Sequence, residues 1–313
     1  MKFSIKHTDP VLLVGDSDLI ATTAVCLLIA GHYVNVCTPN ADTFKQLLGT
    51  HLIAQAKGID YKNRLVVKTT LGAHQNCKLI IAITHENLQL KQDLLQKLMP
   101  VIANNAIVAI NTESIELIDL QKGFSNEERL IGLNWTEPAH TTFFLEIITA
   151  DDDDCAAKEI FTLAKLFWSK DPYNVKNNGI HSRLLGAMAR EASYLVDNGY
   201  ASVDDIDRAC RNDAGYYLPF CGNCRYMDLM GTYAYGMVMK DLNPDLSKDT
   251  KLPNFMEQIV KEGGLGMQNN KGFYNYTEDE VEKWKDVMSK FSYQIQSIIE
   301  KYPFNYHKET YTD

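Results

Sequence analysis

Short apolar runs alternate with longer amphipathic stretches over residues 10–150, and this alternation constrains the fold more than any other feature of the chain. Strands that alternate with helices in this way predict a parallel, doubly wound α/β sheet. The amphipathic segment at 86–102 is expected to form one of the connecting helices. The expected strands are VLLVG, YVNVCT, RLVVKTT, KLIIAIT, AIVAINT, RLIGLNW and FFLEIIT, at 11–15, 33–38, 64–70, 78–84, 106–112, 129–135 and 143–149.

The pattern changes near residue 175, where we place a domain boundary. From residue 183 onward the apolar period is helical, and a long helix is expected at about 278–300. Ser202, followed by acidic residues, is typical of a helix N-cap. The chain therefore predicts an α/β domain over 1–175 and an all-helical domain over 176–313.

Composition excludes several classes of function. The formal charge of −9 argues against a nucleic acid or an anionic membrane surface as partner, because both attract basic faces. No apolar run is long enough for a membrane span, and the start does not resemble a signal peptide. Seven mostly scattered cysteines favour a reducing, cytoplasmic setting. The single C-x-x-C pair, Cys221 and Cys224, has no second pair at metal spacing and is interpreted as a loop, so no metal site is expected.

The segment VLLVGDSDLIATTAV, residues 11–25, has the form of a strand that enters a dinucleotide-binding turn and then a helix. Such a turn uses three glycines, of which only Gly15 is present; Ser17 and Ile20 occupy the other two places. Asp16 and Asp18 add charge that would oppose a phosphate by about 3 kcal/mol at about 5 Å. Two interpretations remain: the carboxylates cap the helix themselves, or the loop still holds a phosphate.

Several stretches match one known family in the right order along nearly the whole chain. They include ITHENLQLKQDLLQKL, NTESIEL, ERLIGLNWTEPAHTTFFLEII, GIHSRLLGAMAREASYLVDNGYASVDDIDRA and GLGMQNNKGFYNY. The chain resembles the L-3-hydroxyacyl-CoA dehydrogenases of fatty-acid oxidation. The resemblance implies a Rossmann-like NAD-binding domain, a helical C-terminal domain that forms a homodimer, and an acyl-CoA substrate oxidised by hydride transfer to NAD.

Five residues are expected to contact the cofactor. Gly15 and Ser17 belong to the turn, and Thr38 stands after the second strand, where an acidic residue would bind the adenosine ribose. By resemblance, Glu86 matches the family's glutamate near the nicotinamide ribose, and Lys91 matches its lysine at the junction of cofactor and substrate. The alternative for both is an exposed helix residue without a ligand.

The catalytic positions differ from the family pattern. The family's histidine, which takes the hydroxyl proton, is replaced by Asn134, whereas its orienting glutamate is present as Glu146, twelve residues later. Asparagine has no proton to exchange at physiological pH. A family serine is Glu113 here, and a family asparagine is Ser182.

Other groups could replace the missing base. His140 and His181 are two candidates, with a structural role as the alternative for each. Glu113, Glu137 and Glu146 would converge if the fold is kept, and could then bind a cation or amine; alternatively one or two face solvent.

These features predict a 3-hydroxyacyl-CoA dehydrogenase-like protein, an oxidoreductase by family, in which activity is weak or lost. A pseudoenzyme of this kind would act as a non-catalytic acyl-CoA-binding or scaffold protein. A third hypothesis is a dehydrogenase of altered substrate that uses another base.

Overall fold

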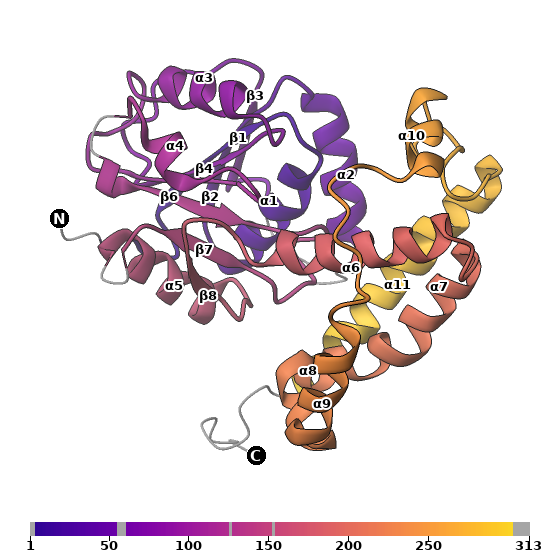
Figure 1. The fold of residues 1–313 in the computed structure, drawn as a ribbon. Coiled ribbons are helices and arrows are strands. Elements are labelled where there is room, and N and C mark those ends of the chain that lie inside the picture. The colour runs from indigo at the N-terminus through magenta and orange to yellow at the C-terminus, as the bar shows by residue number, and fades with distance from the viewer. Residues whose placement is uncertain (1–3, 55–60, 125–126, 152–153, 303–313) are drawn as a thin grey trace. The chain divides into compact units, whose positions relative to one another are not determined.

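The computed structural model describes residues 4–54, 61–124, 127–151 and 154–302. The chain divides into two compact units, Met1–Arg183 and Leu184–Asp313 (Figure 1). The first unit is α/β and the second is helical, which confirms the predicted fold class. None of the helices in these described ranges is long and apolar enough to cross a membrane.

The first unit is built on an eight-stranded sheet with the order β3-β2-β1-β4-β5-β6-β7-β8. Its strands pair in parallel except for β6 and β7, which are antiparallel. The strands are β1 (Pro10–Gly15), β2 (Tyr33–Cys37), β3 (Leu65–Lys68), β4 (Leu79–Ile83), β5 (Ile107–Ile110), β6 (Leu130–Asn134), β7 (Glu146–Thr149) and β8 (Tyr173–Lys176).

Helices cover both faces of this sheet, so its central strands are buried on both sides. β4, β5 and β6 are buried along their whole length, as expected for near-continuous apolar runs in a parallel sheet. One core packs against α1 (Leu19–Ala30), α2 (Ala41–Ala54) and α5 (Cys155–Phe167). A second core packs against α3 (Leu88–Leu98) and α4 (Leu117–Gln121) on the other face, and a short 3₁₀ turn, η1, spans Glu127–Arg129.

The seven expected strands are all present, but the expectation of a wholly parallel sheet was wrong at one pair. β6 and β7 are joined by the short connection 135–145, which contains no crossover helix, so β7 returns antiparallel. The helix α5 then carries the chain to β8, which lies parallel to β7 at the edge of the sheet (Figure 1).

The second unit consists of helices, beginning in α6, which crosses the boundary between the units. Ser202 caps α7 as predicted, in a capping box with Asp205. The predicted last helix is also present and is capped by Thr277. The helices are α6 (His181–Asp197), α7 (Val203–Ala209), the π-helical turn η2 (Cys210–Ala214), α8 (Gly215–Met230), α9 (Thr232–Leu242), α10 (Asn254–Lys261) and α11 (Glu278–Lys301).

The interpretation of the C-x-x-C pair as a loop was correct only at one residue. Cys221 and Cys224 lie in two helical segments of α8 that meet at a kink at Gly222, where φ is +66° and the backbone is not helical. Glycine tolerates this angle at little cost, so the chain breaks the helix at this residue and resumes it directly afterwards. All seven cysteines are free thiols.

Candidate functional site

Gly15 ends β1 at a point where only a glycine fits. It lies beside Ile83 of β4, and a Cβ at this position would stand 1.7 Å from the Ile83 carbonyl oxygen. Its φ of +146° also falls in the region that favours glycine. The sharp exit from β1 into α1 therefore depends on this residue. The side chain of Ile20, at the place of the third glycine, packs 3.2 Å from the same point.

The turn after Gly15 is not capped by its carboxylates, which corrects one of the two sequence interpretations. Asp18 occupies the N-cap of α1 but accepts no side-chain capping hydrogen bond. Asp16 instead accepts a 2.8 Å hydrogen bond from the Thr84 hydroxyl. Ser17 Oγ accepts the Leu19 N–H at 3.3 Å. Within the described chain the backbone N–H groups of Ser17 and Asp18 have no protein acceptor, so they are available to an anion.

Thr38 follows β2 as expected, but its hydroxyl serves the local turn. It is 3% exposed and accepts the Asn40 N–H at 3.3 Å. The Asn40 side chain in turn donates to the Asp16 carbonyl oxygen at 3.3 Å, so the end of β2 is tied to the turn after β1. The predicted contact of Thr38 with the cofactor ribose stays a prediction.

Glu86 connects the loop after β4 to the loop after β5. Its Oε1 accepts the N–H groups of Glu113, Ser114 and Ile115 at 2.8–3.0 Å. Burial by itself would raise the pKa of Glu86, but the Ser114 N–H and the charge of Lys91 outweigh it and lower the pKa to about 2. Glu86 is therefore held as a carboxylate at neutral pH.

Lys91 is the cation that pairs with Glu86, and it is completely buried. Its Nζ lies 3.1 Å from Glu86 Oε2 and donates to the carbonyl oxygens of Thr84 and Asn111. These three acceptors use the donor capacity of an ammonium group. Lys91 thus fixes the ends of β4 and β5, and its predicted role at the junction of cofactor and substrate stays a prediction.

Asn134 and Glu146 face each other across β6 and β7. They are direct partners in the antiparallel register, which converts their separation of twelve residues into a contact. Asn134 Nδ2 donates to Glu146 Oε2 at 2.9 Å, and both side chains are 0% exposed. The carboxylate therefore orients the amide and leaves its Oδ1 as the atom that could meet a ligand.

Further donors surround Glu146. Tyr173 of β8 donates its hydroxyl to Oε1 at 3.0 Å, and burial beside this carboxylate raises the pKa of Tyr173. The N–H groups of Ile180 and His181 donate to the same oxygen at 2.9 Å. Sequence reasoning missed Tyr173, although the residues Tyr-Asn-Val at 173–175 are typical of a short strand. Glu146 thus holds Asn134 in place and binds the start of α6.

Two polar atoms near this carboxylate lack partners. Asn134 Oδ1 and Ser182 Oγ are buried and accept or donate no hydrogen bond within the described chain. A buried, unsatisfied polar atom costs about 1–3 kcal/mol. Both atoms are therefore candidates for contact with a bound ligand or water.

The three glutamates proposed to converge are not in side-chain contact in the part of the chain that the structure describes. Glu113 is exposed; its backbone N–H donates to Glu86, and the charge of its carboxylate favours the protonated form of Lys91. Burial, together with the charge of Asp18, raises the pKa of Glu137. No cluster of three metal-ligating side chains occurs among the described residues.

The two candidate replacement bases have different surroundings. His140 is buried against His51, with ring centroids 4.9 Å apart, and burial lowers its pKa to about 3. His181 places its backbone N–H on Glu146, and its ring lies 4.7 Å from that of Phe144. Of the two, only His181 is fixed next to the Asn134–Glu146 pair by a direct bond to that carboxylate.

Comparison with known proteins identifies two adjoining domain models. Residues 26–178 match the NAD-binding domain of 3-hydroxyacyl-CoA dehydrogenase, and residues 180–276 match the C-terminal domain of the same enzyme. The first match begins after the turn at Gly15.

Among curated relatives, the 5-formyl-3-hydroxy-2-methylpyridine 4-carboxylate 5-dehydrogenase of Mesorhizobium japonicum is 27% identical, over 71% of this chain and 73% of the relative. A probable 3-hydroxyacyl-CoA dehydrogenase of Caenorhabditis elegans is 28% identical, over 72% and 80%.

Solved structures show the same fold. A 5-formyl-3-hydroxy-2-methylpyridine 4-carboxylic acid 5-dehydrogenase, described as an NAD⁺-dependent dismutase, superposes with a TM-score of 0.87 at 22% identity, covering 95% of this chain and 100% of that one. The (S)-3-hydroxybutyryl-CoA dehydrogenase of Ralstonia eutropha gives 0.67 at 22% identity, covering 86% and 99%.

Proposed function

The chain belongs to the 3-hydroxyacyl-CoA dehydrogenase family, since the two domain models of that family match most of its length, and from this premise we propose that it binds NAD and acyl-CoA ligands but oxidises 3-hydroxyacyl-CoA weakly or not at all. It is an oxidoreductase-family protein with an NAD-binding domain. The observation that carries the proposal is the buried Asn134–Glu146 pair.

Hydride removal from an alcohol requires a group that takes the hydroxyl proton. Asn134 cannot do so, because an amide has no proton to exchange at physiological pH. Its oriented Oδ1 can accept a hydrogen bond from a substrate hydroxyl, which supports binding without proton transfer. Glu146 already accepts four hydrogen bonds from the protein and is screened by Asn134.

Retention of NAD is supported by the turn after β1. Gly15 keeps its steric role, and the free N–H groups of Ser17 and Asp18 suit a pyrophosphate at the start of α1. When bound, NAD supplies the hydride acceptor. The residues of the turn after β1 would hold its pyrophosphate, while Glu86 and Lys91 keep the neighbouring ends of β4 and β5 in position.

The test begins with a titration of NADH followed by nicotinamide fluorescence, which we expect to show micromolar binding. Reduction of acetoacetyl-CoA by NADH is then compared for the wild type, Asn134→His and Asn134→Ala. We expect the histidine variant to gain at least tenfold in kcat over the other two, because positioned proton transfer contributes about 10²–10⁴-fold.

Two results would refute this proposal. Wild-type turnover of the same order as that of Asn134→His would show that the missing histidine does not limit the reaction. Absence of NADH binding up to millimolar concentration would remove the cofactor from the proposal and favour a scaffold role.

A second candidate, a dehydrogenase of altered substrate, is favoured by one comparison. One of the solved structures that align over their whole length acts, by its name, on a pyridine carboxylate rather than a thioester. His181, fixed next to Glu146, is the base we would assign to such a reaction. NADH-dependent reduction of aromatic aldehydes that is lost in His181→Ala and kept in His140→Ala would support this alternative.

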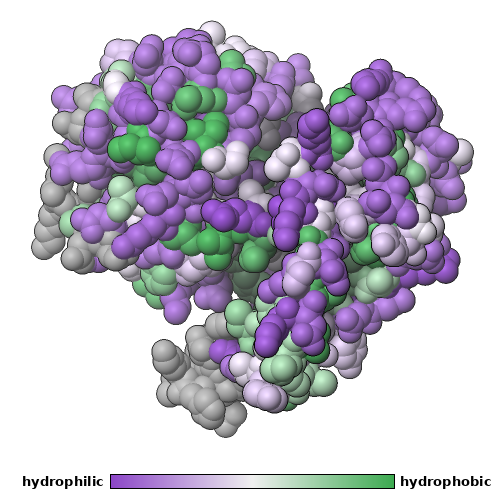
Figure 2. All heavy atoms as spheres, viewed as in Figure 1, coloured by the Kyte–Doolittle hydropathy of each residue, from purple (hydrophilic) through white to green (hydrophobic). Residues whose placement is uncertain are grey.

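The helical unit supports a homodimer. The helices α6, α7, α8, α9 and α10 bury no residue among them except Cys221, although a stable helical domain needs a buried apolar face. Trp284, Val287, Met288 and Phe291 form one stripe along α11, and each is 52–55% exposed. Figure 2 shows further apolar side chains over α8 and α9.

A second copy of the chain is the partner that we propose for these faces. Light scattering of the purified protein should give the mass of a dimer, and Phe291→Glu should shift it to that of a monomer. Lys290→Glu, one residue away and 71% exposed in its side chain, is the matched control. A wild-type monomer at all concentrations would refute the dimer.

The cytoplasm remains the proposed location, because seven free thiols suit a reducing compartment.

A further inference from the structure

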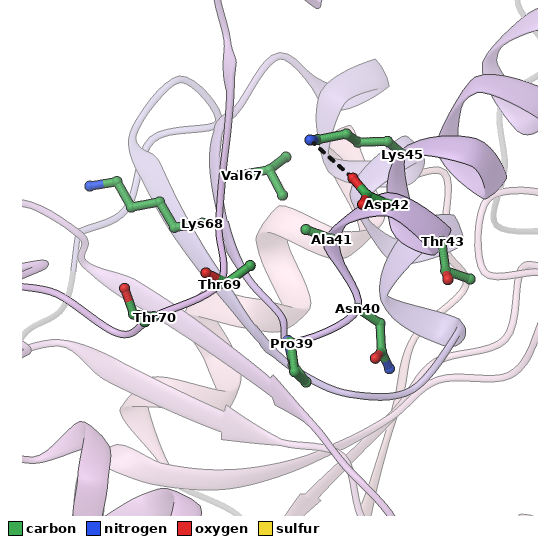
Figure 3. A pocket seen from close by; sticks show the side chains of 10 residues that line it. All are labelled: Pro39, Asn40, Ala41, Asp42, Thr43, Lys45, Val67, Lys68, Thr69 and Thr70. Carbon is green, nitrogen blue, oxygen red and sulfur yellow. Dashed lines mark ion pairs between the residues drawn. The ribbon is translucent and has the colours of Figure 1, made fainter.

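A hollow of about 510 Å³ lies beside the ends of β2 and β3 in the first unit. The residues of the turn after β1 do not line it. Its walls come from the start of α2 on one side and from the exit of β3 on the other (Figure 3). The lining residues are Pro39, Asn40, Ala41, Asp42, Thr43, Lys45, Val67, Lys68, Thr69 and Thr70.

This hollow lies at the end of β2, where doubly wound folds bind the adenosine ribose of a dinucleotide. In doubly wound folds, an acidic residue at the end of the second strand binds the ribose 2′-hydroxyl and excludes a phosphate there. This chain has Thr38 at that place, and its hydroxyl accepts the Asn40 N–H. A 2′-phosphate would therefore meet no carboxylate at the end of β2, and the hollow begins at the next residue, Pro39.

The lining groups suit a phosphate. Lys68 ends β3, and its exposed side chain makes no ion pair or hydrogen bond with any residue that the structure describes, although its backbone carbonyl accepts the Thr38 N–H at 3.0 Å. The hydroxyls of Thr69 and Thr70 and the amide of Asn40 add neutral donors. Figure 3 shows Lys45 and Lys68 extending from different sides of the hollow.

One carboxylate opposes this charge. Asp42, the single acid among the lining residues, has Lys45 Nζ 3.7 Å from its Oδ1, which offsets its charge. Asp16 and Asp18 line a separate, smaller cavity nearby. Among the described residues that line the hollow, Lys68 is therefore the cation without an ion-pair partner, and a phosphate beside it would gain the most favourable electrostatic interaction.

We propose that this hollow takes the 2′-phosphate of NADP(H), with Lys68 as its counter-ion, so that the dinucleotide site admits NADP(H) alongside NAD(H). The proposal rests on the proposed function in so far as that function includes a nicotinamide dinucleotide. Coenzyme A carries a 3′-phosphate on the same sugar, which has the same chemistry, and the experiment must separate the two sources.

The first measurement compares NADPH and NADH by titration of the purified full-length protein. We expect NADPH to bind at least as tightly as NADH. A Kd for NADPH ten times or more above that for NADH would overturn the inference and leave the proposed function standing.

Charge reversal at the hollow gives the second measurement. Lys68→Glu should weaken NADPH at least tenfold relative to NADH. Lys165→Glu is the matched control, because it reverses an exposed lysine on α5, outside the hollow, and should leave the ratio of the two Kd values unchanged. An equal ratio in the wild type and Lys68→Glu would overturn the role of Lys68.

Three fragments test the hollow without the nicotinamide half of the cofactor. We expect 2′,5′-ADP to bind at least tenfold more tightly than 5′-AMP and 3′,5′-ADP. If neither NADH nor NADPH binds, the inference and the proposed function both fail, even where 2′,5′-ADP binds, whereas binding of NADH without NADPH overturns the inference alone. If 3′,5′-ADP binds as tightly as 2′,5′-ADP, the hollow accepts coenzyme A equally well and the assignment to NADP(H) is overturned.

Discussion

Replacement of Glu86 by glutamine tests the ion pair between Glu86 and the buried Lys91, which joins two strand ends of the candidate site. The folded protein lowers the pKa of this carboxyl from 4.5 to about 2. A lowering of that size corresponds to about 3 kcal/mol of stability at neutral pH. Removing one partner of a buried pair costs about 3–5 kcal/mol. The side chain of Lys91 is 0% exposed, but that of Glu86 is 28% exposed, and glutamine keeps one acceptor oxygen; the last two facts reduce the cost. We therefore expect Glu86→Gln to lower the free energy of unfolding by about 2–3 kcal/mol.

The assay is urea unfolding at pH 7, followed by tryptophan fluorescence. Trp135 and Trp168 report on the first unit, since they are 1% and 2% exposed in its core. Glu116→Gln removes the same charge from an exposed side chain of the first unit with no side-chain hydrogen bond among the described residues, and it should change stability by less than about 0.5 kcal/mol.

The pH dependence gives the sign of the effect. A carboxyl whose pKa is lowered on folding stabilises the protein above its unfolded pKa, and this contribution is lost as the pH falls through the folded value. The difference between the wild type and Glu86→Gln should therefore be constant above about pH 4.5 and shrink toward pH 2. Equal stability at pH 7, or a difference that persists undiminished at pH 2, would refute the reasoning.

Three further predictions concern single positions. Gly15→Ala should not yield folded protein, because its Cβ would stand 1.7 Å from the Ile83 carbonyl oxygen. The control Gly49→Ala in α2 places a Cβ with nothing within 4 Å and should fold. Soluble yield and circular dichroism measure folding, and a folded Gly15→Ala variant would contradict the prediction. Ser202→Ala should cost about 1 kcal/mol by loss of the capping box, measured by urea unfolding, and Ser202→Asp should restore most of it. Asp18→Asn should lower the Kd for NADH about fivefold, since an exposed charge near a pyrophosphate opposes binding by about 1 kcal/mol. An unchanged Kd would place this carboxylate away from the cofactor.

The candidate site was predictable from sequence where it depends on local pattern. Gly15 marks the turn because a strand that runs into a helix needs a sharp exit, whereas Glu146 was assigned by resemblance, as the family's glutamate twelve residues after the position of Asn134. Tyr173, Ile180 and His181 were not found as partners of Glu146, because they lie 27–35 residues away and only the sheet and the start of α6 bring them to it. Pairing of Glu86 with residues 113–115 escaped prediction for the same reason.

The amino-acid sequence by itself determined the order of strands and helices and the cap at Ser202, because each depends on residues a few positions apart. The sequence also marked Gly15 as a turn, but the clash with Ile83 of β4 that makes glycine necessary there exists only in the tertiary structure. Only the tertiary structure decided that β7 runs antiparallel to β6, that α8 resumes after the kink at Gly222, and that Asp16 bonds Thr84. These outcomes depend on which distant groups compete for the same hydrogen bonds and the same buried space. The packed fold determines which of these groups form hydrogen bonds or become buried, and this cannot be predicted from residues close together in the sequence.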